Sequence, residues 1–159
     1  PLPGTDPEPS VAMTVNAALF ETGRLVLLAP AKAPQDFGEK AAIAWNGSVQ
    51  SARALTAAMP LIESAKSTVI MTAASHRTEA EGASQLAESL EWRGLAVETQ
   101  VLEEGAGPVG SELLKACQEN GTDFIVMGAY TRSRLRQWIL GGVTSYVLEN
   151  AELPVLMAR

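Results

Sequence analysis

The sequence contains few of the residues on which most metal sites and nucleophilic active sites depend. Cys117 is the only cysteine and His76 the only histidine among 159 residues. A lone cysteine cannot form an intrachain disulfide, and a lone histidine excludes most zinc sites and any chemistry that needs two histidines. Together with the lack of metal-ligand clusters in the sequence, the single cysteine predicts a reducing, cytoplasmic environment.

Positive charge, aromatic residues and long apolar runs are also scarce. The net charge is −6, so there is no excess of lysine and arginine to neutralise the phosphates of a nucleic acid. No apolar run approaches the roughly 18 residues that a membrane span requires. Aromatic residues make up 5% of the chain against 47% for all hydrophobic residues, so small aliphatic side chains must fill the core. We therefore expect one globular domain that binds neither nucleic acid nor a membrane.

From residue 40 onward, short apolar runs alternate with segments of helical periodicity. Strands are predicted at about 41–45, 67–73, 95–101, 123–128 and 154–158, with a helix between each pair, the last from about 138 to 150. Alternating units of this length require right-handed crossovers and a parallel sheet that is covered by helices on both faces. The sequence thus predicts an open, doubly wound α/β domain over residues 40–159.

Capping residues and helix breakers mark the ends of the predicted helices. Ser48 follows the first strand and can cap the next helix, in which Pro60 is expected to cause a kink or a new last turn. Pro108 suits a helix start, and Gly121 suits the end of the same helix.

Residues 1–39 lie outside this pattern. A proline-rich tail (1–10) precedes a predicted helix (11–22), a strand (24–30) and a linker. The segment "ALFETGRLVLLA" (18–29) matches "VLENAELPVLMA" (147–158) at an offset of 129, with identities Leu19/Leu148, Val26/Val155, Leu27/Leu156 and Ala29/Ala158. Any helix–strand junction could give this match. Alternatively, residues 11–29 are the end of a preceding copy of the same domain.

Ligands of doubly wound proteins bind at the carboxyl ends of the strands, and the segment 125–147 suits an anion there. Gly128 ends a strand and permits a close approach of a ligand. Gly141 and Gly142 then open a helix, whose free N–H groups and positive dipole end attract phosphate. Thr144 adds a hydroxyl, and Arg132, Arg134 and Arg136 add positive charge. The simpler interpretation is that Gly128 only makes a turn and the glycine pair only eases helix packing.

Catalytic arrangements are weak by comparison. His76 lies in a predicted loop without a nucleophile motif, and Cys117 lies on the apolar face of a predicted helix. The segment "GAGPVG" (105–110) does not match the dinucleotide fingerprint, so a redox protein is a weak alternative. Trp45, Trp92 and Trp138 are widely spaced and are interpreted as packing residues.

The segment 123–159 resembles the ending of the universal stress protein family. In that family a glycine ends the fourth strand, a second glycine follows after two residues, and nine residues later comes a glycine with a serine or threonine. Gly128 and Gly141 match the first and third positions, whereas Thr131 replaces the second glycine and Gly142 the hydroxyl residue. The segment "AIAWNGSVQSARAL" (42–55) resembles the family's beginning, with Asn46 in place of the usual aspartate.

The resemblance implies a five-stranded parallel sheet in the order 3-2-1-4-5, dimerisation through the last strand and a role in stress responses. Some members contain two copies, and this chain would be the second copy with the end of the first. We therefore predict that residues 24–29 pair antiparallel with residues 154–158, in the same or a second subunit, and that the protein forms a homodimer through its edge strands.

Many family members bind ATP between the first and fourth strands, and others do not. If an adenine nucleotide binds here, with Mg²⁺, the resemblance implies phosphates over Gly141, Gly142 and Val143, with Thr144 donating its hydroxyl. Adenine would lie near the ends of the first two strands, and the fourth strand and its loop would complete the site. The full set is Trp45, Asn46, Thr72, Ala73, Met127, Gly128, Thr131, Arg132, Gly141, Gly142, Val143 and Thr144.

Two departures from the family pattern bear on this nucleotide site. Thr131 brings a side chain close to the phosphates, and Asn46 lacks the carboxylate that would help to hold a nucleotide or metal. The leading hypothesis is a non-enzymatic stress-response protein that responds to nucleotide. The alternatives are an interaction module that has lost its ligand and a slow nucleotide hydrolase.

Overall fold

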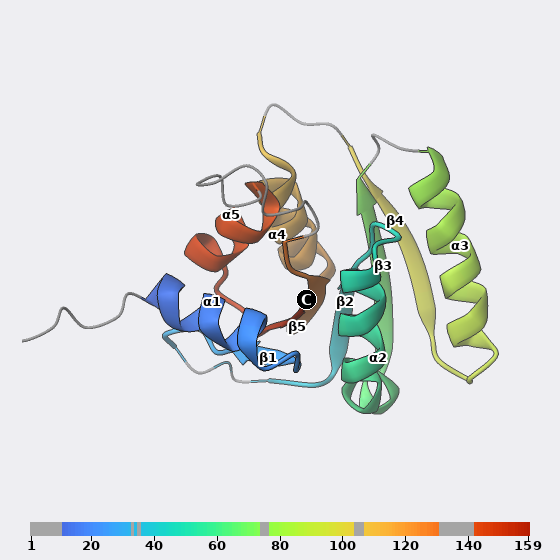
Figure 1. The fold of residues 1–159 in the computed structure, drawn as a ribbon. Helices are drawn as coiled ribbons and strands as arrows, with labels where there is room; N and C mark the ends of the chain where they lie inside the picture. The colour runs from blue at the N-terminus through green and yellow to red at the C-terminus, as the bar shows by residue number, and fades with distance from the viewer. Residues whose placement is uncertain (1–10, 33, 35, 74–76, 104–106, 131–141) are drawn as a thin grey trace, which may run out of the picture.

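The computed structural model describes residues 11–32, 34, 36–73, 77–103, 107–130 and 142–159, which form one sheet between two layers of helices (Figure 1). The elements in chain order are α1 (Val11–Glu21), β1 (Val26–Leu28), β2 (Lys40–Ala44), α2 (Val49–Ser64), β3 (Ser67–Ala73), α3 (Arg77–Glu91), β4 (Val97–Leu102), α4 (Val109–Asn120), β5 (Phe124–Gly128), α5 (Gly142–Asn150) and β6 (Val155–Ala158). None of these helices is both long and apolar enough to cross a membrane.

The strands form a six-stranded sheet in the order β1-β6-β5-β2-β3-β4. The five strands from β2 to β6 are parallel, and when they are counted from β2 they have the predicted order 3-2-1-4-5. β1 pairs antiparallel with β6 in the same chain, with Leu27 opposite Leu156. The predicted α/β fold and the extra antiparallel strand at this edge are therefore confirmed.

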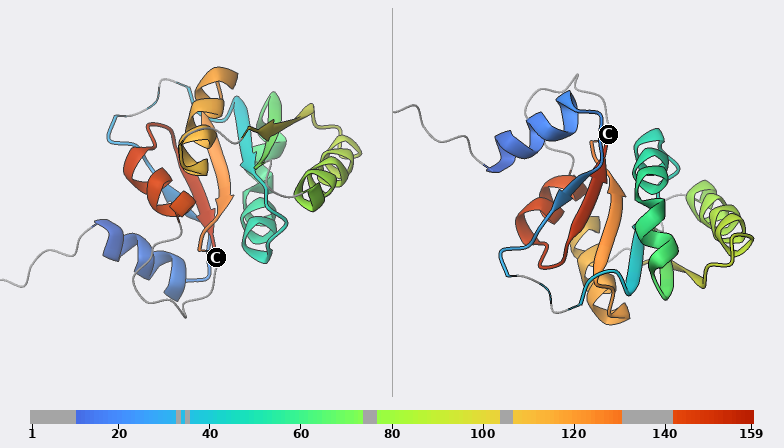
Figure 2. Two further views of the ribbon diagram at one scale, coloured as in Figure 1. Left: turned by 90° about the horizontal axis from the view of Figure 1, so that it is seen from above. Right: turned by 90° about the horizontal axis from the view of Figure 1, so that it is seen from below.

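Helices cover both faces of the sheet (Figures 1 and 2). α1, α4 and α5 pack on one face, where side chains such as Leu19, Leu113 and Val147 form one core with alternate strand residues. α2 and α3 pack on the other face, where residues such as Ile62 and Leu90 form a second core. Because both faces are covered, the central strands consist of continuous apolar runs rather than alternating ones.

The predicted caps are present at the helix ends. Ser48 is the N-cap of α2, and its Oγ accepts a hydrogen bond of 3.1 Å from the amide of Ser51. α4 starts directly after Pro108 and ends at Gly121, which adopts the left-handed conformation with φ 62°. α2 is one continuous helix through Pro60. The proline lies at an exposed position, so water can satisfy the carbonyl that loses its intrahelical partner.

Candidate functional site

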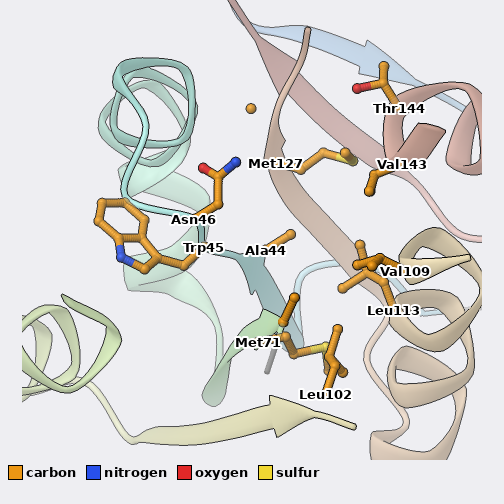
Figure 3. Close-up of a pocket in the computed structure, with 12 residues that line it drawn as sticks. Ala44, Trp45, Asn46, Met71, Leu102, Val109, Leu113, Met127, Val143 and Thr144 are labelled. Carbon is orange, nitrogen blue, oxygen red and sulfur yellow. The ribbon is translucent and has the colours of Figure 1, made fainter. Parts of the chain in front are cut away.

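A small cavity of about 120 Å³ opens at the carboxyl ends of the parallel strands (Figure 3). In the sheet, β2 lies between β3 on one side and β5 on the other. The strand order therefore reverses at β2, and the cavity lies at this switch point. α4 and α5 close the remaining side. The residues that line it are Ala44, Trp45, Asn46, Met71, Ala73, Leu102, Val109, Leu113, Met127, Gly128, Val143 and Thr144.

The structure brings together most of the residues that the sequence predicts for a nucleotide site. Seven of them line the cavity: Trp45, Asn46, Ala73, Met127, Gly128, Val143 and Thr144. Thr72 is instead buried within β3, and Gly142 starts α5 at an exposed position; neither lines the cavity. Thr131, Arg132 and Gly141 lie outside the described residues, as do Arg134 and Arg136.

Five lining residues were not predicted, namely Ala44, Met71, Leu102, Val109 and Leu113. A signal for the first three was present, because the ends of all parallel strands meet at one edge of the sheet. Val109 and Leu113 stand four residues apart on one face of α4, but helical spacing does not say which part of the sheet a helix covers. They give the cavity an apolar wall.

Trp45 contributes its backbone to the cavity more than its ring. Its N–H donates to the carbonyl oxygen of Met71 at 2.8 Å. The ring points away from the other lining side chains (Figure 3) and packs into the core beneath α2 and α3. Its buried Nε1 finds no hydrogen-bond partner among the described residues, and a Cβ at Gly82 of α3 would lie 3.4 Å from it. Trp45 is therefore a packing residue rather than a platform for a base.

Asn46 takes part in the turn between β2 and α2. Its Oδ1 accepts hydrogen bonds from the Ser48 amide at 3.2 Å and from Ser48 Oγ at 2.7 Å. These bonds occupy the carbonyl oxygen, so the Nδ2 group is the part of the side chain that can donate to a ligand. An aspartate could accept the same two bonds and would add a negative charge.

Gly128 is required by the packing of a helix. A Cβ at this position would lie 2.5 Å from the backbone nitrogen of Ser51 and 2.7 Å from the carbonyl carbon of Gln50. The amino end of α2 therefore lies directly against the end of β5. The lack of a side chain at Gly128 permits this close contact, independently of any ligand.

Thr144 joins α5 to the end of β5. Only 5% of its surface is exposed, and its Oγ1 accepts a long hydrogen bond of 3.4 Å from the amide of Tyr130. A hydroxyl that accepts a bond keeps its own proton for another acceptor. Because Thr144 and Val143 lie in the first turn of α5, this wall of the cavity also carries the positive end of a helix dipole.

Cys117, the only cysteine of the chain, lies buried in α4. Burial raises the pKa of the Cys117 thiol to about 11, so Cys117 is protonated at neutral pH and is not a nucleophile. Within the described residues there is no group of three or more histidine, cysteine, aspartate or glutamate side chains that could hold a metal ion. His76 lies outside the described residues.

Fold and cavity together define a doubly wound α/β protein with a cavity at the switch point of its sheet. Residues 39–159 match the universal stress protein family, and the chain belongs to that family. Universal stress protein MJ0577 of Methanocaldococcus jannaschii is 33% identical over 48 residues, which are 30% of each chain. Universal stress protein MJ0531 of the same organism is 33% identical over 69 residues, 43% of this chain and 38% of that protein. The matches thus span well under two thirds of these relatives.

Solved structures show the same fold. A universal stress protein from Archaeoglobus fulgidus DSM 4304 has a TM-score of 0.70 at 17% identity, and the match covers 85% of this chain and 49% of that one. The structure of MJ0577 has a TM-score of 0.56 at 20% identity and covers 78% of this chain and 98% of that one.

Proposed function

We propose that this chain is a non-catalytic stress-response protein that binds an adenine nucleotide at the carboxyl edge of its sheet. The observation that carries the proposal is the position of the cavity, which lies at the switch point and directly beside the first turn of α5. An apolar hollow beside a helix N-terminus suits a ligand with a flat ring at one end and negative charge at the other.

The size of the cavity suits one ring of the base. Its volume of about 120 Å³ is close to that of the engineered apolar cavity of roughly 150 Å³ that binds benzene, so there is room for a ring but not for a whole nucleotide. Met71, Leu102 and Met127 offer apolar and sulfur contacts to a ring. Asn46 can donate from Nδ2 to a ring nitrogen or a ribose oxygen.

The phosphates would lie outside the cavity, along the start of α5. The amides of the first turn of a helix have no intrahelical partners, and here that turn includes Gly142, Val143 and Thr144. The Thr144 hydroxyl can donate a further bond, because it accepts from Tyr130. Mg²⁺ would be held chiefly by the phosphates and water, since Asn46 supplies no carboxylate.

Slow turnover or none is expected. The lining residues of the cavity include no carboxylate, histidine, lysine or arginine. No group in this set could act as a general base for an attacking water. Residues 131–141, which include three arginines, lie outside the described residues.

Calorimetry with Mg-ATP tests the proposal with a matched pair of variants. Val109 lines the cavity and is 43% exposed, so Val109→Trp can fill the opening without disturbing the core. Val101 is 50% exposed and does not line the cavity, so Val101→Trp is the control. We expect Val109→Trp to weaken binding at least tenfold and Val101→Trp to leave it unchanged. A wild-type protein that binds no adenine nucleotide would favour an interaction module.

An interaction role has support of its own from β1. The repeat equates Leu27 with Leu156, and these two residues lie opposite each other in the β1–β6 pair. Val26 lies opposite Met157, and Leu28 lies opposite Val155. The repeat equates Val26 with Val155 and Leu28 with Met157, so exchanging the two copies converts one pair into the other. A register centred on equivalent residues is what a two-fold axis between two copies of one strand produces.

We therefore also propose that α1 and β1 are the end of a preceding copy of the domain. Leu156 is buried in the core that α2 and α3 cover, whereas its counterpart Leu27 is 53% exposed. A second domain would cover Leu27 with the equivalent of α2. Solved structures of about twice the matched length cover 84–85% of this chain, against 76–79% for single-length ones, which supports this proposal.

Light scattering tests whether a second copy of this chain docks at β1. We expect a wild-type mass of twice the chain mass of 16.8 kDa, and a return to the chain mass in Leu27→Lys. A wild-type mass near 16.8 kDa at micromolar concentration would refute the homodimer. Val101→Lys, at the opposite edge of the sheet, is the control for added charge.

A further inference from the structure

Tyr130 has an unusual backbone conformation at the exit of β5. Its φ is 54°, and among the described residues it is the only non-glycine with a positive φ. A side chain in this left-handed region is disfavoured by contact between Cβ and the backbone. Contacts elsewhere must therefore stabilise Tyr130 in this conformation.

Those contacts come from α1, more than a hundred residues earlier in the chain. The phenol Oη of Tyr130 donates to Oδ1 of Asn16 at 2.6 Å. The centroids of the Tyr130 and Phe20 rings lie 5.2 Å apart. The guanidinium carbon of Arg159 lies over the same Phe20 ring, 3.9 Å from its centroid. Burial raises the pKa of Tyr130 still further above neutral, so the phenol is protonated and can donate.

The backbone of Tyr130 in turn contacts the cavity wall. Its amide donates to Oγ1 of Thr144 at 3.4 Å, and Thr144 lines the cavity in the first turn of α5. The neighbouring amide of Ala129 is already bound to the carbonyl of Ala158 at 2.8 Å. The φ of Tyr130 thus links the side chain that α1 contacts to the amide that donates to Thr144.

We infer that Tyr130 is a positioning residue of the ligand site and that Asn16 of α1 holds it in place. The ligand part of this inference rests on the proposed nucleotide binding. The structural part, that α1 orders the exit of β5 and the start of α5, does not. α1 therefore has a role at the site besides its role in covering the sheet. Anything that moves α1, such as a domain docked on β1, would change the affinity of the site.

Hydrogen exchange without ligand tests the structural part. In Asn16→Ala we expect the Tyr130 amide to exchange about fivefold faster, as the loss of one hydrogen bond predicts. Asn16→Asp keeps an acceptor for the phenol and should restore the slow rate. Tyr130→Phe removes the donor and should match Asn16→Ala. The control Asn120→Ala loses an amide–amide bond of 2.7 Å to Gln100 elsewhere and should change nothing at Tyr130.

The amide of Val126, in the middle of β5, is the internal reference for global opening. Unchanged exchange at Tyr130 in Asn16→Ala would overturn the inference, as would an equal acceleration at Val126 and Tyr130. Calorimetry with Mg-ATP on the same variants separates this inference from the proposed function. If the wild type binds, Asn16→Ala should weaken binding about fivefold, and Asn16→Asp should restore it. If the wild type does not bind, the proposed function fails and the exchange rates decide the inference.

Discussion

Gly128 ends β5 and Gly142 starts α5, but alanine should destabilise the protein strongly only at Gly128. At Gly128 a Cβ would meet the backbone nitrogen of Ser51 at 2.5 Å and the carbonyl carbon of Gln50 at 2.7 Å. These are backbone atoms within the first turn of α2, so no rotamer change can relieve the contact. Either α2 or the end of β5 must shift.

The cost of Gly128→Ala follows from this geometry. Overpacking of a core typically costs about 1–3 kcal/mol, and a backbone contact that cannot relax belongs at the upper end. We therefore expect a loss of about 3 kcal/mol in the free energy of unfolding. For a chain of this length that corresponds to a decrease of roughly 6–12 °C in Tm.

Gly142→Ala is the control. A Cβ there meets nothing within 4 Å, and the residue starts a helix, where alanine is acceptable. Its free energy of unfolding should stay within about 1 kcal/mol of wild type. Urea unfolding followed by tryptophan fluorescence measures both variants against wild type. Equal stability of Gly128→Ala and Gly142→Ala would refute the conclusion that α2 packing requires the first glycine.

Three further predictions follow from single contacts. Asn46→Asp keeps the acceptor for Ser48 and adds a carboxylate, so calorimetry should show roughly fivefold tighter binding of ATP with Mg²⁺ and weaker binding without it; the same change in both would contradict the assignment. Gly110→Ala places a Cβ 2.8 Å from Cβ of Tyr146 and should cost about 1–3 kcal/mol in urea unfolding; Tyr146→Ala keeps that Cβ, so a full rescue by Tyr146→Ala would contradict the assignment. The pKa of Cys117 is raised by burial from 9.0 to about 11, so its contribution to stability is present below pH 9 and is lost as the pH rises toward 11. Cys117→Ala should remove roughly 3 kcal/mol of that decrease, and an identical pH profile would contradict it.

The fold could be predicted from the sequence because each of its determinants is local or periodic. Apolar runs such as residues 67–73 and 124–128 are short enough only for strands, and the helices between them require parallel pairing. The antiparallel pairing of β1 with β6 was predictable from the match between residues 18–29 and 147–158 together with the resemblance, which implies pairing through the last strand. The edge of the sheet at which a ligand would bind follows from the same topology, which is why Asn46, Met127 and Thr144 were found.

The contacts that the sequence could not predict join segments that share no pattern. Nothing in "GAYT" indicates that Tyr130 adopts a left-handed conformation, since glycine or asparagine normally marks such a position. Its partner Asn16 lies in a helix whose apolar positions predict only that it packs somewhere. Gly128 shows the same difficulty, because a glycine beside a phosphate and a glycine beneath a helix look alike in sequence. In both cases the deciding quantity is a distance across the molecule. The family pattern therefore locates the cavity, while α1 and α2, packed on opposite faces of the sheet, contact the residues at its edge.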